Sequence, residues 1–248
     1  MAELQISSVL MGPGSNKPAQ LADTAIAPTA RKARTGPKPA LTRNQIARAA
    51  IAIADSEGLD AVSMQRLARA VSVTTMALYR YFSSKTELIE LMIDIAGGPA
   101  PNLDALERGW RPRLAEWARQ CSAIYRRHPW FLEATMTPGR NMGQNELSWL
   151  DAAFTILGRT ELTAREQHKA FLVLIGHVRS SAEFALAQAK GRSASWEPAM
   201  RLGKYRDSYP ALTAAVQSGA FAEPIGTSID FGLECILSGI RAITRARR

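Results

Sequence analysis

Apolar positions recur at helical spacing along the chain from residue 42 onward. In the first such stretch, Ile46, Ala50 and Ile53 fall on one face, at intervals of three and four residues. No segment shows the sustained alternation of apolar and polar residues that is typical of a half-buried strand. The pattern therefore predicts an all-α fold.

Four short helices are predicted between residues 42 and 96. Capping boxes, in which Ser or Thr is followed three residues later by Glu or Gln, mark the start of the first helix at Thr42 and of the fourth at Ser84. Ser63 is expected to cap the second helix, and Gly58 to end the first. The third helix is shorter than the others.

The second and third helices predict a DNA-binding motif. A four-residue turn through Ser72 and Val73 leads into the third helix, at about residues 74 to 82. Two short helices joined in this way form a helix-turn-helix, whose second helix enters the major groove of DNA. We expect Leu78 and Phe82 to face a small core. The side chains left for DNA are those of Thr74, Thr75, Met76, Ala77, Tyr79, Arg80 and Tyr81.

The chemistry of this third helix suits a nucleic acid. Tyrosine hydroxyls can bond phosphate oxygens, and Arg80 can bind a phosphate or the O6 and N7 atoms of guanine. Lys85 falls in the first turn of the fourth helix, where backbone N–H groups already attract an anion. The alternative is that Tyr79 and Tyr81 fill a core and that Lys85 is a solvated surface charge.

Net charge points to the same partner. The chain carries 31 Lys and Arg against 22 Asp and Glu, a formal charge of +9. Residues 31 to 85 hold ten basic and three acidic residues, so this segment alone is +7. Residues 1 to 40 predict a disordered arm with a basic end. The arm would be a solubilising tail, or would follow phosphates or enter a minor groove.

Longer helical segments are predicted after a break at Gly97, Gly98 and Pro99. They cover roughly residues 107 to 127, 129 to 136, 144 to 158, 163 to 190, 197 to 217 and 226 to 246. The segments 163 to 190 and 226 to 246 are apolar on more than one stripe, which predicts burial on two sides. We expect them to pair with their symmetry mates in a homodimer, with Gly232 and Gly239 permitting close approach.

Other classes of protein find little support in the sequence. Cys121 and Cys235 lie in apolar helical patterns and are expected to be buried thiols, which fits a cytoplasmic protein. No apolar run or leader pattern predicts a membrane span or secretion. The enzyme alternative lacks a catalytic triad, a phosphate-binding loop or paired carboxylates. His128, His168 and His177 form no cluster at metal-ligand spacing, so no metal is expected.

Residues 41 to 92, LTRNQIARAAIAIADSEGLDAVSMQRLARAVSVTTMALYRYFSSKTELIELM, resemble the DNA-binding domain of the tetracycline-repressor (TetR) family of bacterial regulators. YRRHPWFLEA, NELSWLDAAFTILG, LIGHVRSSAE and IDFGLECILSGI are similar to the C-terminal domain of the tetracycline-repressor branch. The resemblance implies a DNA-binding domain at 41–96 and a ligand-binding and dimerisation domain at 97–248, after the arm at 1–40.

The resemblance also assigns roles within the DNA-binding domain. Carried over position by position, the base-facing groups are Gln65, Thr74, Thr75 and Met76, and the phosphate-facing groups are Ala77, Tyr79, Tyr81 and Lys85. Arg43 and Arg80 complete the DNA-binding candidates. Ala77 lacks the hydroxyl that family members often carry there, and Met76 could contact only a thymine methyl.

For the whole chain, the resemblance implies a cytoplasmic homodimeric repressor without a cofactor. It would bind a palindromic operator in double-stranded DNA and leave it when a small apolar or aromatic effector enters the C-terminal domain. The ligand-binding candidates are Trp117, Trp130, Asn145, Trp149, His177 and Phe184. The helix from Ser84 to about Ala96 would act as a lever between ligand and DNA. Control by a protein partner instead of a small ligand remains an alternative.

Overall fold

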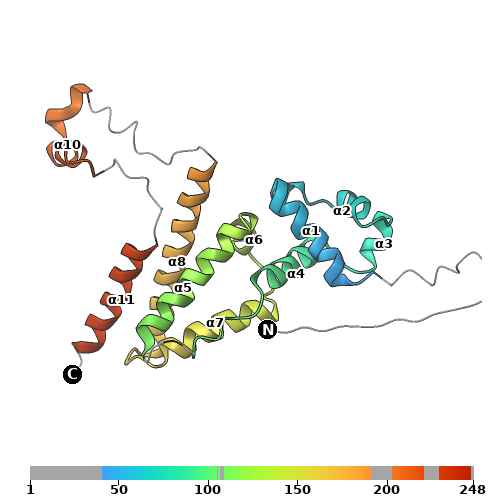
Figure 1. Cartoon of the computed structure of the whole chain (residues 1–248), viewed down its shortest axis with the longest axis horizontal. Coiled ribbons are helices and arrows are strands. Elements are labelled where there is room, and N and C mark those ends of the chain that lie inside the picture. The colour runs from blue at the N-terminus through green and yellow to red at the C-terminus, as the bar shows by residue number, and fades with distance from the viewer. Residues whose placement is uncertain (1–40, 105, 107–108, 191–202, 221–228, 247–248) are drawn as a thin grey trace, which may run out of the picture. The chain divides into compact units, whose positions relative to one another are not determined.

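The computed structural model in Figure 1 describes residues 41–104, 106, 109–190, 203–220 and 229–246, without the side chains of Lys204 and Tyr205. The expected disordered arm at 1–40 lies outside the described residues, as do parts of the last two expected helices. Every regular element in the described part of the chain is a helix. The prediction of an all-α fold is therefore confirmed.

The first part of the fold is a bundle of short helices. Its elements are α1 (Arg43–Glu57), the 3-10 turn η1 (Leu59–Ala61), α2 (Met64–Ala70), α3 (Thr75–Tyr79) and α4 (Lys85–Gly97). Thr42 Oγ1 accepts from the backbone N–H of Gln45, and Gln45 Oε1 accepts from that of Thr42, so the first capping box is present. Gly58 ends α1 with φ of 90°, and Ser63 caps α2.

The start of α4 differs from the prediction. Ser84 Oγ accepts from the backbone N–H of Glu87 at 3.1 Å, as expected. The Glu87 carboxylate, however, accepts from the backbone N–H and hydroxyl of Ser83, at 2.6 and 2.8 Å, and from Arg43 Nη2 at 2.6 Å. The predicted reciprocal box was wrong here because Ser83 and the guanidinium of α1 hold the carboxylate instead.

A small apolar core fixes the angle between α2 and α3. Ile46, Leu67 of α2, Leu78 of α3 and Phe82 are fully buried in it, which stabilises the bundle by roughly 1.5 to 3 kcal/mol for each side chain. The turn between the two helices places Ser72 at φ of 56°, in the left-handed region. The fold thus sets α3 on the outside of the bundle, with one face inward.

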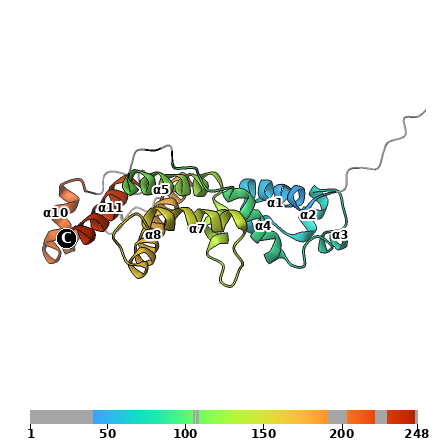
Figure 2. The ribbon, with the colours of Figure 1, turned by 90° about the horizontal axis from the view of Figure 1, so that it is seen from below.

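The second part of the fold consists of longer helices. They are α5 (Trp110–Arg127), α6 (Trp130–Thr135), α7 (Gln144–Leu157), α8 (Ala164–Ala189), η2 (Gly203–Ser208), α10 (Pro210–Gln217) and α11 (Asp230–Arg245). α5 packs against α7 and α8, and α8 also packs against α11, beside which it runs in Figure 1. Figure 2 shows α4 between α1 and α7, and it contacts both.

One expected helix is broken and one expected burial is wrong. The segment 197 to 217 is not continuous in its described part, because Pro210 lacks an N–H and instead begins α10 after the 3-10 turn η2. Cys121 is buried as predicted, and burial raises the pKa of its thiol. Cys235 is exposed, because it lies on the outer face of α11.

α8 is long and apolar enough to cross a membrane, judged by length and composition alone. Core helices of soluble proteins meet the same criterion. Leu174, Val178 and Ala182 of α8 are buried within the protein, while Leu172 and Val173 are exposed. The buried face is explained by packing against α5 and α11, and the exposed residues bear on the dimer discussed below.

Candidate DNA-binding surface and ligand cavity

α3 presents two different faces. Leu78 is fully buried beneath it, whereas Met76 and Tyr79 are 76% and 49% exposed and Arg80, the C-cap residue, is also exposed. An exposed methionine, tyrosine and arginine on a helix of this length leave an apolar, aromatic and cationic surface for a partner. This arrangement is what direct contact with a DNA groove requires.

The other α3 candidates are less free. Thr75, Ala77 and Tyr81 are half-buried, and Tyr81 packs against the core. Thr74 is exposed, but its Oγ1 already accepts from the backbone N–H of Ala77 at 3.2 Å as the helix cap. Gln65 is exposed on α2, the preceding helix. The two tyrosines are therefore unequal, with Tyr79 the more accessible to DNA.

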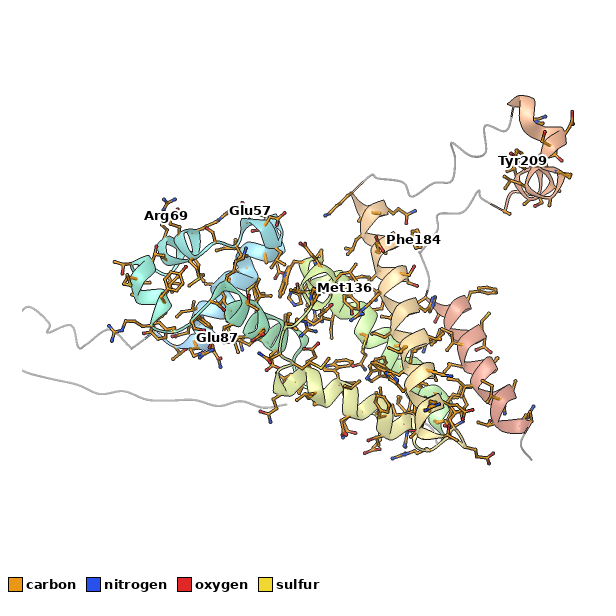
Figure 3. The ribbon with its side chains drawn as sticks, turned by 180° about the vertical axis from the view of Figure 1, so that it is seen from behind. Glu57, Arg69, Glu87, Met136, Phe184 and Tyr209 are labelled. Carbon is orange, nitrogen blue, oxygen red and sulfur yellow. The ribbon has the colours of Figure 1, made fainter. Side chains whose placement is uncertain are left out.

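The two cationic candidates beside α3 have different surroundings. Lys85 is the first residue of α4 and is exposed, next to the unpaired N–H groups of the helix start. Arg43 is ion-paired with Glu87, and its guanidinium carbon lies 4.7 Å from the centre of the Phe82 ring. Lys85 is thus the freer charge, while Arg43 also braces α1 against α4. Glu87 lies at the start of α4 in Figure 3.

Acid should reveal the bonds that Glu87 makes. Hydrogen bonds from Ser83 and then from Arg43 lower the pKa of Glu87 to about 2. Because the pKa is lower in the folded state, the stabilisation is present above pH about 4.5 and is lost as pH falls towards 2. In a series of thermal melts from pH 5 to pH 2, we expect Glu87→Gln to lose less melting temperature than the wild type. Parallel curves for the two proteins would contradict these bonds.

A cavity of about 460 Å³ lies among α4 to α8. Its size falls in the range of small-molecule sites, which are mostly apolar with a few polar groups. The wall is largely aromatic and aliphatic: the Trp117 ring lies 6.1 Å from that of Trp149 and 6.0 Å from that of Phe171, edge to face in both pairs. Polar groups in the wall come from Tyr125, Thr135, Arg140, Glu146, His168 and Arg179.

The structure divides the six predicted ligand residues. Trp117 and Trp149 line the cavity, but Trp130, Asn145, His177 and Phe184 do not. Phe184 lies towards the C-terminal end of α8, five residues beyond Arg179, the last cavity residue on that helix (Figure 3). Of the six predicted ligand residues, this cavity therefore brings together Trp117 and Trp149.

The other three residues hold helices together. Trp130 Nε1 donates to Asp55 Oδ1 of α1 at 2.6 Å, and the same oxygen lies 2.8 Å from His128 Nδ1. Asn145 Nδ2 donates to the backbone oxygen of Asp94 in α4 at 2.9 Å. His177 Nε2 bonds the backbone oxygen of Ile229 at 2.8 Å, next to α11. Each polar side chain is used between elements, which sequence spacing does not reveal.

A carboxylate of α4 caps α7, which the sequence analysis missed. Gly143, the N-cap residue of α7, has no side chain to cap it. Asp94 Oδ1 accepts from the backbone N–H groups of Asn145 at 2.7 Å and Glu146 at 3.3 Å. One turn earlier, Glu90 Oε1 accepts from the backbone N–H of Asn141 at 2.7 Å. The glycine at the helix start was the available signal, because it leaves N–H groups that need an acceptor.

The cavity also touches α4 directly. Ile93 and Gly97 of α4 form part of its wall. Trp149 of α7, which also lines the cavity, donates from Nε1 to the backbone oxygen of Gly98, the C-cap of α4, at 3.0 Å. A molecule in the cavity would therefore meet both the end of α4 and the tryptophan that bonds it.

No group of three His, Cys, Asp or Glu residues suited to a metal occurs in the described ranges.

A helix-turn-helix joined to a helical domain with an apolar cavity defines a ligand-responsive transcriptional regulator. The family model for bacterial regulatory proteins of the tetR family matches residues 46–92, and that for the tetracyclin repressor-like C-terminal domain matches residues 101–244. The chain belongs to the TetR family of transcriptional regulators.

Individual relatives agree with this assignment. The HTH-type transcriptional repressor DrrR1 of Streptomyces coeruleorubidus is 32% identical over 231 residues, which cover 89% of this chain and 84% of that protein. A TetR family regulator of Streptomyces coelicolor A3(2) has 26% identity and a TM-score of 0.68, over 81% of this chain and 99% of that one. The structure of Streptomyces coelicolor ActR with actinorhodin has 22% identity and a TM-score of 0.71, over 82% and 98%, and shows likeness of fold.

Proposed function

We propose that this chain is a cytoplasmic, homodimeric repressor that leaves a palindromic operator when a small aromatic or apolar molecule binds in the α4 to α8 cavity. The observation that carries the proposal is the shared use of α4. Ile93 and Gly97 at one end line the cavity, and Lys85 at the other end follows the recognition helix α3. The relative DrrR1 is a repressor, and the related fold of ActR holds actinorhodin, which supports this direction of control.

The proposed DNA contacts come from α2, α3 and the start of α4. Met76, Tyr79 and Arg80 would meet the groove, with Lys85 on a phosphate. The remaining candidates are Arg43, Gln65 and Thr74, which are exposed, and Thr75, Ala77 and Tyr81, which are half-buried. Dimer symmetry would place two such surfaces about 34 Å apart, one turn of DNA. The domains would span residues 41–96 and 97–248, preceded by the basic arm.

Two glycines were expected to lie on the dimer face, and their surroundings differ. A Cβ on Gly232 would lie 2.3 Å from Cε1 of His177 in the same protomer, so this glycine serves α8–α11 packing. A Cβ on Gly239 would meet no atom within 4 Å. Phe231, 83% exposed, and Cys235 precede Gly239 at intervals of four residues on α11. We therefore place the dimer contact on this outer face of α11 and on the exposed Val173 of α8.

The control of α4 would work through the α7 clamp. A ligand against Trp149 would disturb its bond to Gly98 and shift the end of α4. Asp94 and Glu90, bound to the start of α7, would carry this shift into the DNA-binding bundle. A typical coupling free energy of about 1 to 3 kcal/mol is enough to weaken operator binding severalfold to a hundredfold. The proposal requires an effector but no cofactor.

Arg80→Ala should test the recognition surface. We expect it to weaken binding to the promoter next to its own gene by about tenfold or more, because Arg80 is exposed at the end of α3. Melting temperature should change little. The measurement is a binding isotherm repeated over a salt series, since phosphate contacts give a steep loss of affinity with salt.

A matched control is Arg126→Ala, which removes the same charge from an exposed position in the last turn of α5. It should leave operator affinity close to that of the wild type. If both variants bind equally well, α3 does not read the operator. A salt-independent affinity of the wild type would argue against phosphate contacts altogether.

A further inference from the structure

The cavity contains two arginines in very different electrostatic states. Arg140 binds the Glu146 carboxylate through both terminal nitrogens, at 2.6 and 2.5 Å. The two side chains are only 7% and 20% exposed, and the hydrogen bond that Arg140 donates to Glu146 raises the pKa of Arg140. The pair as a whole carries no net charge. Because both terminal nitrogens of Arg140 already bond a carboxylate, the pair does not favour an anionic ligand.

Arg179 has no such partner among the described residues. Its one hydrogen bond there runs from Nε to the hydroxyl of Tyr125, at 3.4 Å. Glu183 lies one helical turn further along α8, but no ion pair joins it to Arg179. A guanidinium has five N–H donors in a planar fork, so the outer face of Arg179 is available. With the Arg140 pair neutral, Arg179 gives the cavity a net positive charge.

We propose that the effector is a planar aromatic molecule that carries a carboxylate, and that Arg179 binds this carboxylate. The inference rests on the proposed function and adds the chemical class of the ligand. The rings would lie against Trp117, Trp149 and Phe171, whose side chains form the aromatic wall. A planar carboxylate matches the outer N–H fork of the guanidinium with two parallel hydrogen bonds.

Desolvation makes the cavity selective for an anion. A bound molecule displaces water from Arg179, which borders the same cavity as the tryptophans. A neutral ligand would leave this guanidinium both dehydrated and unpaired, which is costly in apolar surroundings. A carboxylate restores the lost hydrogen bonds with charge-assisted ones. The aromatic wall would provide affinity and Arg179 would provide discrimination.

The test compares two probes of equal shape, anthraquinone-2-carboxylate and anthraquinone-2-carboxamide. Dissociation constants are measured by calorimetry with the full chain at pH 7.5. We expect the wild type to bind the carboxylate at least about tenfold more tightly, as expected for a hydrogen bond to a charged group. Arg179→Met should reduce this ratio to below about threefold and keep its affinity for the carboxamide. Arg179→Lys, which retains the charge without the fork, should give an intermediate ratio.

Arg165→Met is the matched control. It removes one exposed positive charge from the same helix, outside the cavity, and should keep the wild-type ratio. A wild type that binds both probes equally, or an Arg179→Met variant that retains the full ratio, would overturn the inference. If the carboxamide still released the operator in that case, the proposed function would stand although the inference about the carboxylate had failed. Binding of neither probe would overturn the inference and count against the ligand cavity itself.

Discussion

Gly143→Ala is expected to lower the free energy of unfolding by about 3 kcal/mol. A Cβ at this position would lie 2.2 Å from Oδ1 of Asp94 and 2.6 Å from its Cβ, so the carboxylate must leave the start of α7. Two backbone N–H groups then lose a charged acceptor. Differential scanning calorimetry should measure the loss.

The same variant should change the shape of the unfolding transition. Asp94 joins the DNA-binding bundle to α7, so its displacement should separate one cooperative transition into two. Asp94→Asn is the milder companion: it keeps the shape of the side chain and removes its charge, and we expect roughly half the effect. A Gly143→Ala protein that melts like the wild type would show that Asp94 does not cap α7.

Gly239→Arg should convert the dimer to a monomer and reduce operator affinity by about a hundredfold or more. The position is exposed and meets no atom of its own protomer, so the protomer should fold normally. In the proposed dimer, the added charge would fall within the outer apolar face of α11. Loss of the second DNA-binding unit removes the gain from binding two half-sites together. Light scattering measures the mass, and a binding isotherm measures the affinity.

Gly232→Ala is the control for this prediction. Its new Cβ would collide with the ring of His177, so it should lower the melting temperature through the protomer itself. The two glycines, seven residues apart, thus predict opposite signatures: one variant unstable, the other stable but monomeric. A Gly239→Arg protein that stays dimeric would move the interface elsewhere.

The sequence predicted best those features that depend on neighbouring residues. The caps at Thr42 and Ser63 and the inward face of α3 follow from short-range patterns, and the structure has them. Ser84 was predicted correctly as a cap, but the role of Glu87 was not, because its carboxylate bonds the neighbouring Ser83 and also Arg43, which lies 44 residues earlier. A contact between residues so far apart in the sequence, such as that of Arg43 with Glu87, cannot be predicted from the spacing of residues.

The ligand site was the harder prediction for the same reason. Trp117 and Trp149 could be chosen because large aromatic side chains in a helical domain gather in cores and cavities. Trp130 has the same aromatic signal and Asn145 offers a polar group, but buried polar atoms must find partners. Their partners, Asp55 and Asp94, come from the other half of the chain. Only the tertiary fold distinguishes a side chain that lines the cavity from one that is hydrogen-bonded to another helix.

The bond between Asp55 and Trp130 limits how this regulator can be recombined with others. A chimera that grafts residues 41 to 97 onto the sensor of another regulator keeps Asp55 but exchanges the tryptophan and histidine that bind it. An unmatched carboxylate would then face the new domain, and one of the bonds that join the DNA-binding bundle to the sensor would be lost. Biosensors built from this chain should carry His128 and Trp130 together with the DNA-binding unit, so that the bonds to Asp55 are kept.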